Sequence, residues 1–187
     1  MALFHWTMAA GAGTCVGTVL YAQYLPKEEK ALKGQLMGVH KSIGLAMAVL
    51  LVPRLAVRML SKIPAHPAGP EVQARAGEAA HALLLASLGI LTTTGLGFTY
   101  FWGAGVPFFG IPAWPGAEGD AKNPAFAKQL FWLHSKTGQF FEYLVPIHLG
   151  GVAVGYAQGT NMLARMWPFG KEVSKQAAPV VAAAVTK

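Results

Sequence analysis

Histidines are the residues of this 187-residue sequence whose type and spacing suggest a specific chemistry. Of the six, His134 and His148 are 14 residues apart, which is close to four helical turns of 3.6 residues. A helix would therefore hold both on one face, about 21 Å apart along its axis. Histidine is a common axial ligand of haem iron, so this spacing predicts two separate ligand sites on one helix.

The composition places these histidines in a membrane protein. Apolar residues make up 53% of the chain, charged residues only 12%, and the mean hydropathy is +0.40. Soluble domains carry about 25% charged residues, so a compact soluble enzyme and a disordered chain are both excluded. The single cysteine, Cys15, excludes an internal disulfide framework. The net charge of +7 fits basic loops beside membrane helices better than a nucleic-acid-binding face.

Four stretches are long and apolar enough to cross a bilayer, which takes about 20 residues. We predict an all-α membrane protein, a four-transmembrane-helix bundle within residues 1–170, and a C-terminal tail at 171–187. The longest connection, 103–124, is rich in proline and aromatic residues, and we expect it to lie back over the membrane surface. The predicted spans are 2–24, 36–60, 79–102 and 130–158.

Basic residues predict the orientation of the bundle. They surround the connection between the second and third spans and follow the fourth span, so these regions, and the N-terminus with them, are predicted to face the inner side of the membrane. The residues concerned are Arg54, Arg58, Lys62, Arg75, Arg165, Lys171 and Lys175.

Depth then sorts four histidines into two pairs. His40 and His134 lie near the outer ends of the second and fourth spans, whereas His5 and His148 lie near the inner ends of the first and fourth. Two histidines at one depth on facing helices can bind one haem iron from opposite sides, and helical bundles build cofactor sites from such side chains. We therefore predict two haems, about 20 Å apart, with a spacing suited to electron transfer across the membrane.

A second interpretation is that these histidines form hydrogen bonds between helices, as polar residues do in membrane bundles. A single histidine would favour it, but four that pair by depth favour haem. Arg54 and Lys41 are candidate partners of haem propionates, although topology alone also explains Arg54. Glycines on the spans would leave room for porphyrins or simply allow close helix packing. His66, in a proline-rich connection, is most simply a solvated surface residue.

Motifs in all four spans resemble the bacterial-type di-haem cytochrome b561 family, which includes the bacterial superoxide oxidase. No single motif is specific, but the ordered set with its 14-residue histidine spacing is. The motifs are His5-Trp6 in the first span, GVHKSIGLAM and PRLAVR in the second, EAAHALLL in the third, and WLHSKTGQFFEYLVPIHLGG with NMLARMWP in the fourth.

The resemblance implies four helices that hold two haem b groups, with His40 and His134 on one iron and His5 and His148 on the other. It also implies electron transfer with ubiquinone as a partner, and some family members oxidise superoxide. His81, in the third span, resembles a family histidine that is not an iron ligand and borders a quinone or a propionate. A histidine exposed to lipid headgroups is an equal alternative for this position.

The function favoured by the sequence is a di-haem b-type cytochrome that exchanges electrons with a quinone, with its status as an oxidoreductase left open. The alternative is a haem-bearing accessory or anchor subunit of a larger respiratory or photosynthetic complex, whose other subunits would order the aromatic connection and the tail. Weaker alternatives are a haem-free helical protein and an anchor like those of succinate or formate dehydrogenases. We expect a bacterial or mitochondrial inner membrane, with a plastid membrane less favoured.

Overall fold

The computed structural model describes residues 2–60, 70–159 and 163, and most of them are helical. The predicted tail and His66 lie outside the described residues. The elements in chain order are α1 (Ala2–Tyr24), α2 (Lys30–Leu60), α3 (Glu71–Trp102), β1 (Val106–Phe108), β2 (Ile111–Trp114), the 3-10 helix η1 (Gly119–Ala121) and α4 (Pro124–Ala157).

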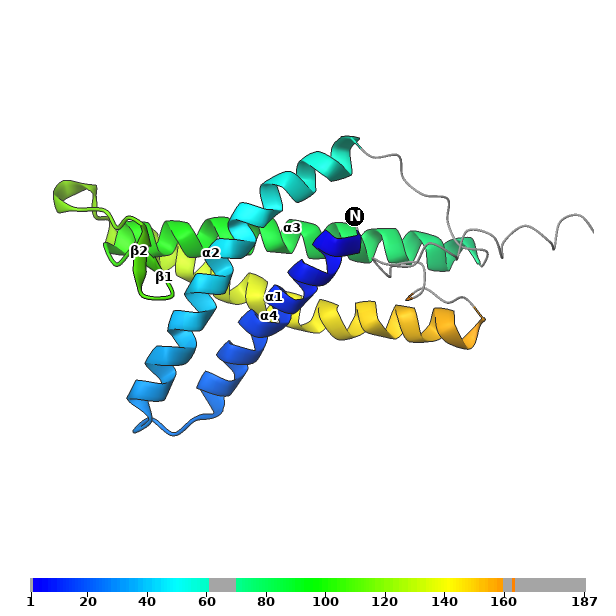
Figure 1. Cartoon of the computed structure of the whole chain (residues 1–187), viewed down its shortest axis with the longest axis horizontal. Coiled ribbons are helices and arrows are strands. Elements are labelled where there is room, and N and C mark those ends of the chain that lie inside the picture. The colour runs from blue at the N-terminus through cyan, green and yellow to red at the C-terminus, as the bar shows by residue number, and fades with distance from the viewer. Residues whose placement is uncertain (1, 61–69, 160–162, 164–187) are drawn as a thin grey trace, which may run out of the picture.

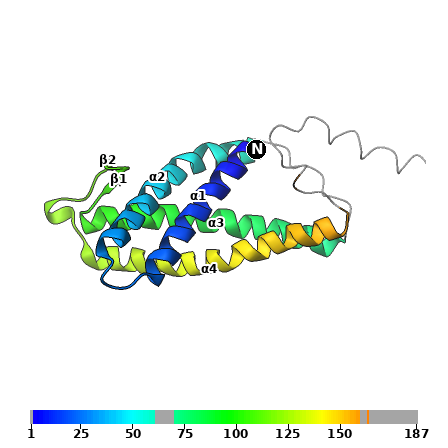
Figure 2. The ribbon, with the colours of Figure 1, turned by 60° about the horizontal axis from the view of Figure 1, so that its bottom comes forward.

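The four α-helices form two helical hairpins. α1 packs along α2, and α3 packs along α4, while contacts between α2 and α3 join the two hairpins. Figure 1 shows the α1–α2 hairpin crossing the α3–α4 hairpin, and Figure 2 shows α3 and α4 lying side by side along their length. The short link between α1 and α2 makes these two helices antiparallel neighbours.

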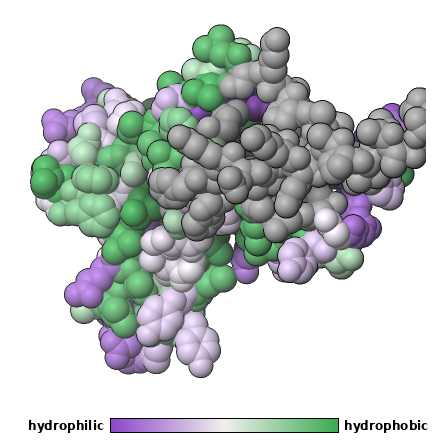
Figure 3. Space-filling view, turned by 45° about the vertical axis from the view of Figure 1, so that its right-hand side comes forward, coloured by the Kyte–Doolittle hydropathy of each residue, from purple (hydrophilic) through white to green (hydrophobic). Residues whose placement is uncertain are grey.

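Three of the described segments are long and apolar enough to cross a membrane: α2, α3 and Gly119–Ala157, which contains α4. Many large apolar side chains of the helices point outward, where lipid and not water would cover them. Apolar residues accordingly cover much of the visible helix surface in Figure 3. α1 has 23 residues and no charged side chain, and its role as a fourth span remains a prediction.

α1 has the predicted bounds, whereas α2, α3 and α4 begin six to eight residues before the predicted spans, at Lys30, Glu71 and Pro124. α4 begins at Pro124, where the proline occupies the first turn and the Asn123 side chain accepts a hydrogen bond from the Phe126 amide at 3.0 Å. α3 ends at Gly103, whose φ of 83° is the left-handed conformation that terminates helices.

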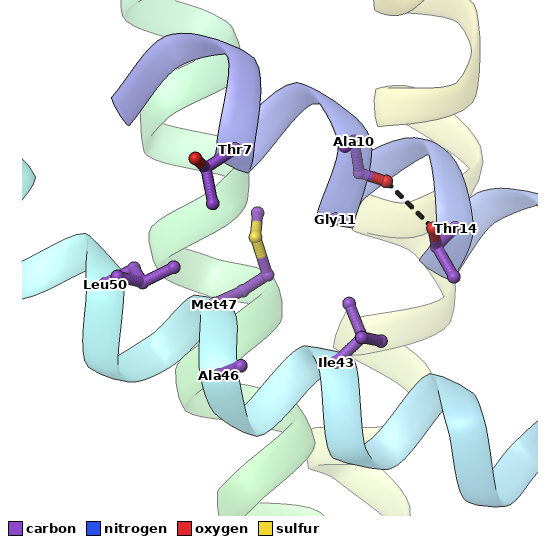
Figure 4. Close-up of a pocket in the computed structure, with 8 residues that line it drawn as sticks. All are labelled: Thr7, Ala10, Gly11, Thr14, Ile43, Ala46, Met47 and Leu50. Carbon is purple, nitrogen blue, oxygen red and sulfur yellow. Dashed lines mark hydrogen bonds between the residues drawn. The ribbon is translucent and has the colours of Figure 1, made fainter. Parts of the chain in front are cut away.

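The middle of the bundle is apolar. Met8, Met47 and Leu51 form its buried cluster, with Leu85 and Leu88 of α3 packed against it. A glycine brings α1 close to α2 at this level, because a Cβ at Gly11 would lie 2.6 Å from the Met47 sulfur. Figure 4 shows Met47 directed at α1 in a shallow groove between the two helices, lined by Thr7, Ala10, Gly11, Thr14, Ile43, Ala46, Met47 and Leu50.

The connection between α3 and α4 contains an antiparallel β-hairpin that the sequence analysis did not predict. Phe108 pairs with Ile111 across a two-residue turn, Phe109-Gly110, in which both residues have positive φ, as short hairpins favour. Ser42 of α2 holds this turn. Its Oγ accepts a hydrogen bond from the Phe109 amide at 2.9 Å and lies within donating distance of the Pro107 and Gly38 carbonyls. The connection therefore contacts α2 directly, two residues beyond His40, while its predicted place over the membrane surface stays a prediction.

We expect Ser42→Ala to loosen the β-hairpin, because Ser42 is only 1% exposed and its removal leaves the Phe109 amide without an acceptor. An unsatisfied buried donor costs about 1–3 kcal/mol. Thermal unfolding in detergent and the rate of proteolysis within the hairpin measure the effect. Thr93→Ala is the matched control, because it removes an exposed hydroxyl that bonds only its own helix. Equal behaviour of the two variants would contradict the role of Ser42.

Candidate functional site

The four histidines that the sequence analysis paired by depth lie in the same two pairs in space. The ring centroids of His40 on α2 and His134 on α4 are 6.1 Å apart, and the two planes are nearly perpendicular at 86°. Those of His5 on α1 and His148 on α4 are 6.3 Å apart, with the planes at 56°. Each pair therefore joins a helix of the α1–α2 hairpin to α4. Their role as metal ligands remains a prediction.

These separations fit a metal ion held between two imidazoles. A metal–nitrogen bond to histidine is about 2.0 Å long, and each ring nitrogen lies about 1.1 Å from its ring centre. Two imidazoles on opposite sides of one ion would thus have centroids about 6.2 Å apart. Direct contacts between aromatic rings also have centroid distances of about 4.5–7 Å, so the distance alone does not distinguish a metal site from such a contact. The hydrogen bonds of the rings provide the further evidence.

The ring of His40 is oriented by a backbone carbonyl of the neighbouring helix. Its Nδ1 lies 3.1 Å from the carbonyl oxygen of Cys15 on α1. Since a carbonyl only accepts, Nδ1 carries the proton and the lone pair resides on Nε2, which is the arrangement typical of metal-binding histidines. The Cys15 thiol in turn donates to the His40 carbonyl, with a sulfur–oxygen distance of 3.7 Å. This pair of contacts fixes His40 against α1.

His134 has the same kind of partner on α3. Its Nδ1 lies 3.0 Å from the Leu91 carbonyl oxygen and 3.3 Å from the hydroxyl of Thr94, a buried residue. Gly95 makes this approach possible, because a Cβ there would lie 3.1–3.2 Å from ring atoms of His134. Both rings of the pair therefore keep Nε2 available for a ligand bond.

The donor set fits haem better than a bare ion. A structural metal ion such as zinc takes four protein ligands, whereas haem iron brings four porphyrin nitrogens and needs only axial ligands from the protein. Each site offers two histidines, and the described part of the chain contains no group of three or more metal-binding side chains. Space also exists beside the first pair. Gly44 and Gly138 lie one turn after His40 and His134, and a Cβ at Gly44 would meet nothing within 4 Å.

The other predicted site residues lie near one pair or the other. Lys41 directly follows His40 on α2 and is half-buried. Arg54, 14 residues after His40, is half-buried at the level of the second pair and interacts electrostatically with His5 and His81. The ring of His81, on α3, has its centroid 5.0 Å from that of His148.

Sequence reasoning missed the groups that orient the first pair. The carbonyls of Cys15 and Leu91 carry no signal in a sequence, since every residue has a carbonyl group. Gly95 did have a sequence signal, because it lies 14 residues after His81, the same interval that separates His134 from His148.

We expect Gly95→Ala to weaken haem binding by the His40–His134 pair, because the added methyl group displaces the His134 ring from the Leu91 carbonyl. Loss of such an orienting contact costs about 10-fold to 100-fold in metal affinity. Haem retention during dilution of the purified protein measures it. Gly89→Ala on the same helix is the control, because a Cβ there meets nothing within 4 Å. Equal retention in the two variants would show that Gly95 does not position His134.

Comparison with known proteins agrees with this geometry. A family model described as prokaryotic cytochrome b561 matches residues 1–169, which include both histidine pairs and all four α-helices. A search of curated proteins found no match. The family is one of membrane b-type cytochromes that act in electron transfer. The chain therefore belongs to the prokaryotic cytochrome b561 family and is a multi-pass integral membrane protein.

Proposed function

We propose that this protein binds two haem b groups, one between His40 and His134 and one between His5 and His148, and transfers electrons between them across the membrane. One observation carries the proposal: the rings of each pair lie 6.1 or 6.3 Å apart, a separation that suits a bis-histidine iron, and in the first pair backbone carbonyls take up both Nδ1 protons and leave both Nε2 atoms free. When bound, haem b supplies a one-electron exchange between ferric and ferrous iron.

The protein's contribution at the first site is orientation and basicity of the ligands. Carbonyls on α1 and α3 accept the Nδ1 protons of His40 and His134, which leaves the lone pair of each ring on Nε2. Hydrogen bonds of this kind raise the basicity of a histidine ligand and hold its ring in one orientation. The same two rings connect the two helical hairpins, so haem at this site would join them.

Between the two sites the protein provides a dry apolar layer. Phe141, only 4% exposed, lies seven residues after His134 and seven before His148, so it shares their helix face at the midpoint. Met47 lies seven residues after His40 and belongs to the buried cluster of Met8 and Leu51. The two sites are about 21 Å apart along α4. An apolar layer of this kind would oppose the passage of hydrated ions between the sites, whereas electrons could still cross it.

Basic side chains support anionic groups on the cofactor. A guanidinium in a membrane helix needs a counter-charge, and Arg54 lies near His5 and His81. A haem propionate at the His5–His148 site would supply that charge, and Lys41 would serve a propionate at the His40–His134 site. Both assignments belong to the proposal.

A quinone is the electron partner that we propose, in the bacterial inner membrane. Two features support this choice. Lipid-soluble carriers reach sites inside a bilayer, and α2 and α4, which carry three of the four paired histidines, are long and apolar enough to span one. The family resemblance implies the same partner class, with quinone-linked oxidoreductase activity as the reaction.

We expect His148→Ala to lose one of two haems and to keep the other, because His40 and His134 do not depend on that side chain. His134→Ala should give the complementary result. A pyridine haemochrome assay per mole of purified chain measures both, with His66→Ala as a control that also removes one histidine and keeps both haems. Retention of both haems by His148→Ala would rule out the proposed pairing.

A further inference from the structure

We propose that His81 is a positioning residue for the second site, where it accepts a hydrogen bond from Nδ1 of His148 and fixes that axial ligand. The inference rests on the proposed function, because it requires a haem between His5 and His148. It assigns His81 neither to the iron nor to a quinone.

The distances separate the two kinds of contact that His148 makes. Imidazoles that share an N–H···N hydrogen bond of about 2.9 Å have ring centres about 5 Å apart, since each nitrogen lies about 1.1 Å from its centre. Imidazoles on opposite sides of an iron need about 6.2 Å. His148 lies 5.0 Å from His81 and 6.3 Å from His5. The His81 ring is thus too close to be the opposite ligand. It lies in edge contact with His148, with the two planes at 64° and no hydrogen bond between these two described residues, and its distance is the one that the proposed hydrogen bond needs.

Comparison of the two sites gives the same assignment. α3 presents two residues 14 positions apart, His81 and Gly95, to the two histidines of α4 that are also 14 apart. At the first site, the missing side chain of Gly95 lets His134 reach the Leu91 carbonyl. At the second site, the equivalent position carries an imidazole beside His148.

A metal-bound histidine almost always donates its other ring N–H to an acceptor. The backbone supplies that acceptor for His134, and the side chain of His81 stands where it can supply one for His148. Such a hydrogen bond raises the basicity of His148, which stabilises ferric iron and lowers the reduction potential of this haem. The two sites would therefore orient their histidine ligands differently. A main-chain carbonyl orients His134, and a side chain, which mutation can replace, would orient His148.

The test is a potentiometric titration of the full-length protein in detergent, followed by optical spectra and by EPR of the ferric haems. It compares the wild type with His81→Ala, His81→Gln and Leu83→Ala. The glutamine retains an acceptor oxygen. Leu83→Ala is the matched control on α3, because its side chain is 45% exposed and lies on the far face of the helix from His81. The haem of the second site is identified as the one that His5→Ala lacks.

We expect His81→Ala to raise the reduced-to-oxidised ratio of this haem about tenfold at a fixed potential, a shift of about 59 mV for one electron. Its EPR signal should change as well, while the other haem stays as in the wild type. His81→Gln should remain within about threefold of the wild type, and Leu83→Ala should match it. Loss of this haem from His81→Ala, with retention in His81→Gln, would also support the proposal.

An unchanged reduced-to-oxidised ratio of this haem in His81→Ala would overturn the inference. Equal shifts of both haems in that variant would do so as well. The same holds if His81→Ala and His81→Gln have equal effects, or if both variants lose this haem. A wild type without any His5-dependent haem would instead overturn the proposed function. The two failures are therefore distinguishable within one set of proteins.

Discussion

The structure depends on hydrogen bonds between histidine rings and main-chain carbonyls of adjacent helices. His40 donates to Cys15 across the α1–α2 hairpin, and His134 donates to Leu91 across the α3–α4 hairpin. Each helical hairpin is thus closed by one of its own candidate ligands, and the centroids of the two rings then lie 6.1 Å apart. Direct packing between the hairpins runs mainly through α2, which contacts both α3 and β1 of the connection between α3 and α4. A cofactor bound between the rings would supply much of the remaining contact.

The interior repeats at intervals of seven residues, and this repeat would let one bundle hold the two proposed sites and still separate them. On α4 the series is His134, Phe141 and His148, and on α3 it is Gly95, Leu88 and His81. The middle member of each series is apolar, and Phe141 is buried. The end members of the two series lie beside each other and differ. Gly95 leaves room for the ring of His134 at one end, and the His81 side chain lies beside His148 at the other.

The sequence predicted the helices and the histidine pairs because both follow from periodicity and hydropathy, which are local properties. His134 and His148 identify a shared face by spacing alone, and depth along the spans brings His40 and His5 to them. The β-hairpin escaped prediction, since its paired residues include Pro107 and Pro112 and its position depends on one distant hydroxyl, that of Ser42. The carbonyl acceptors of Cys15 and Leu91 escaped it because a main-chain group has no residue type.

The central claim is that the two histidine pairs are two haem sites in one chain. The most direct measurement is the haem content of the purified wild-type protein, by pyridine haemochrome assay against protein quantified by amino-acid analysis, with a reduced-minus-oxidised spectrum of the same sample. Our account predicts two haem b groups per chain and a b-type α-band. A single haem per chain, or a spectrum without that band, would contradict it.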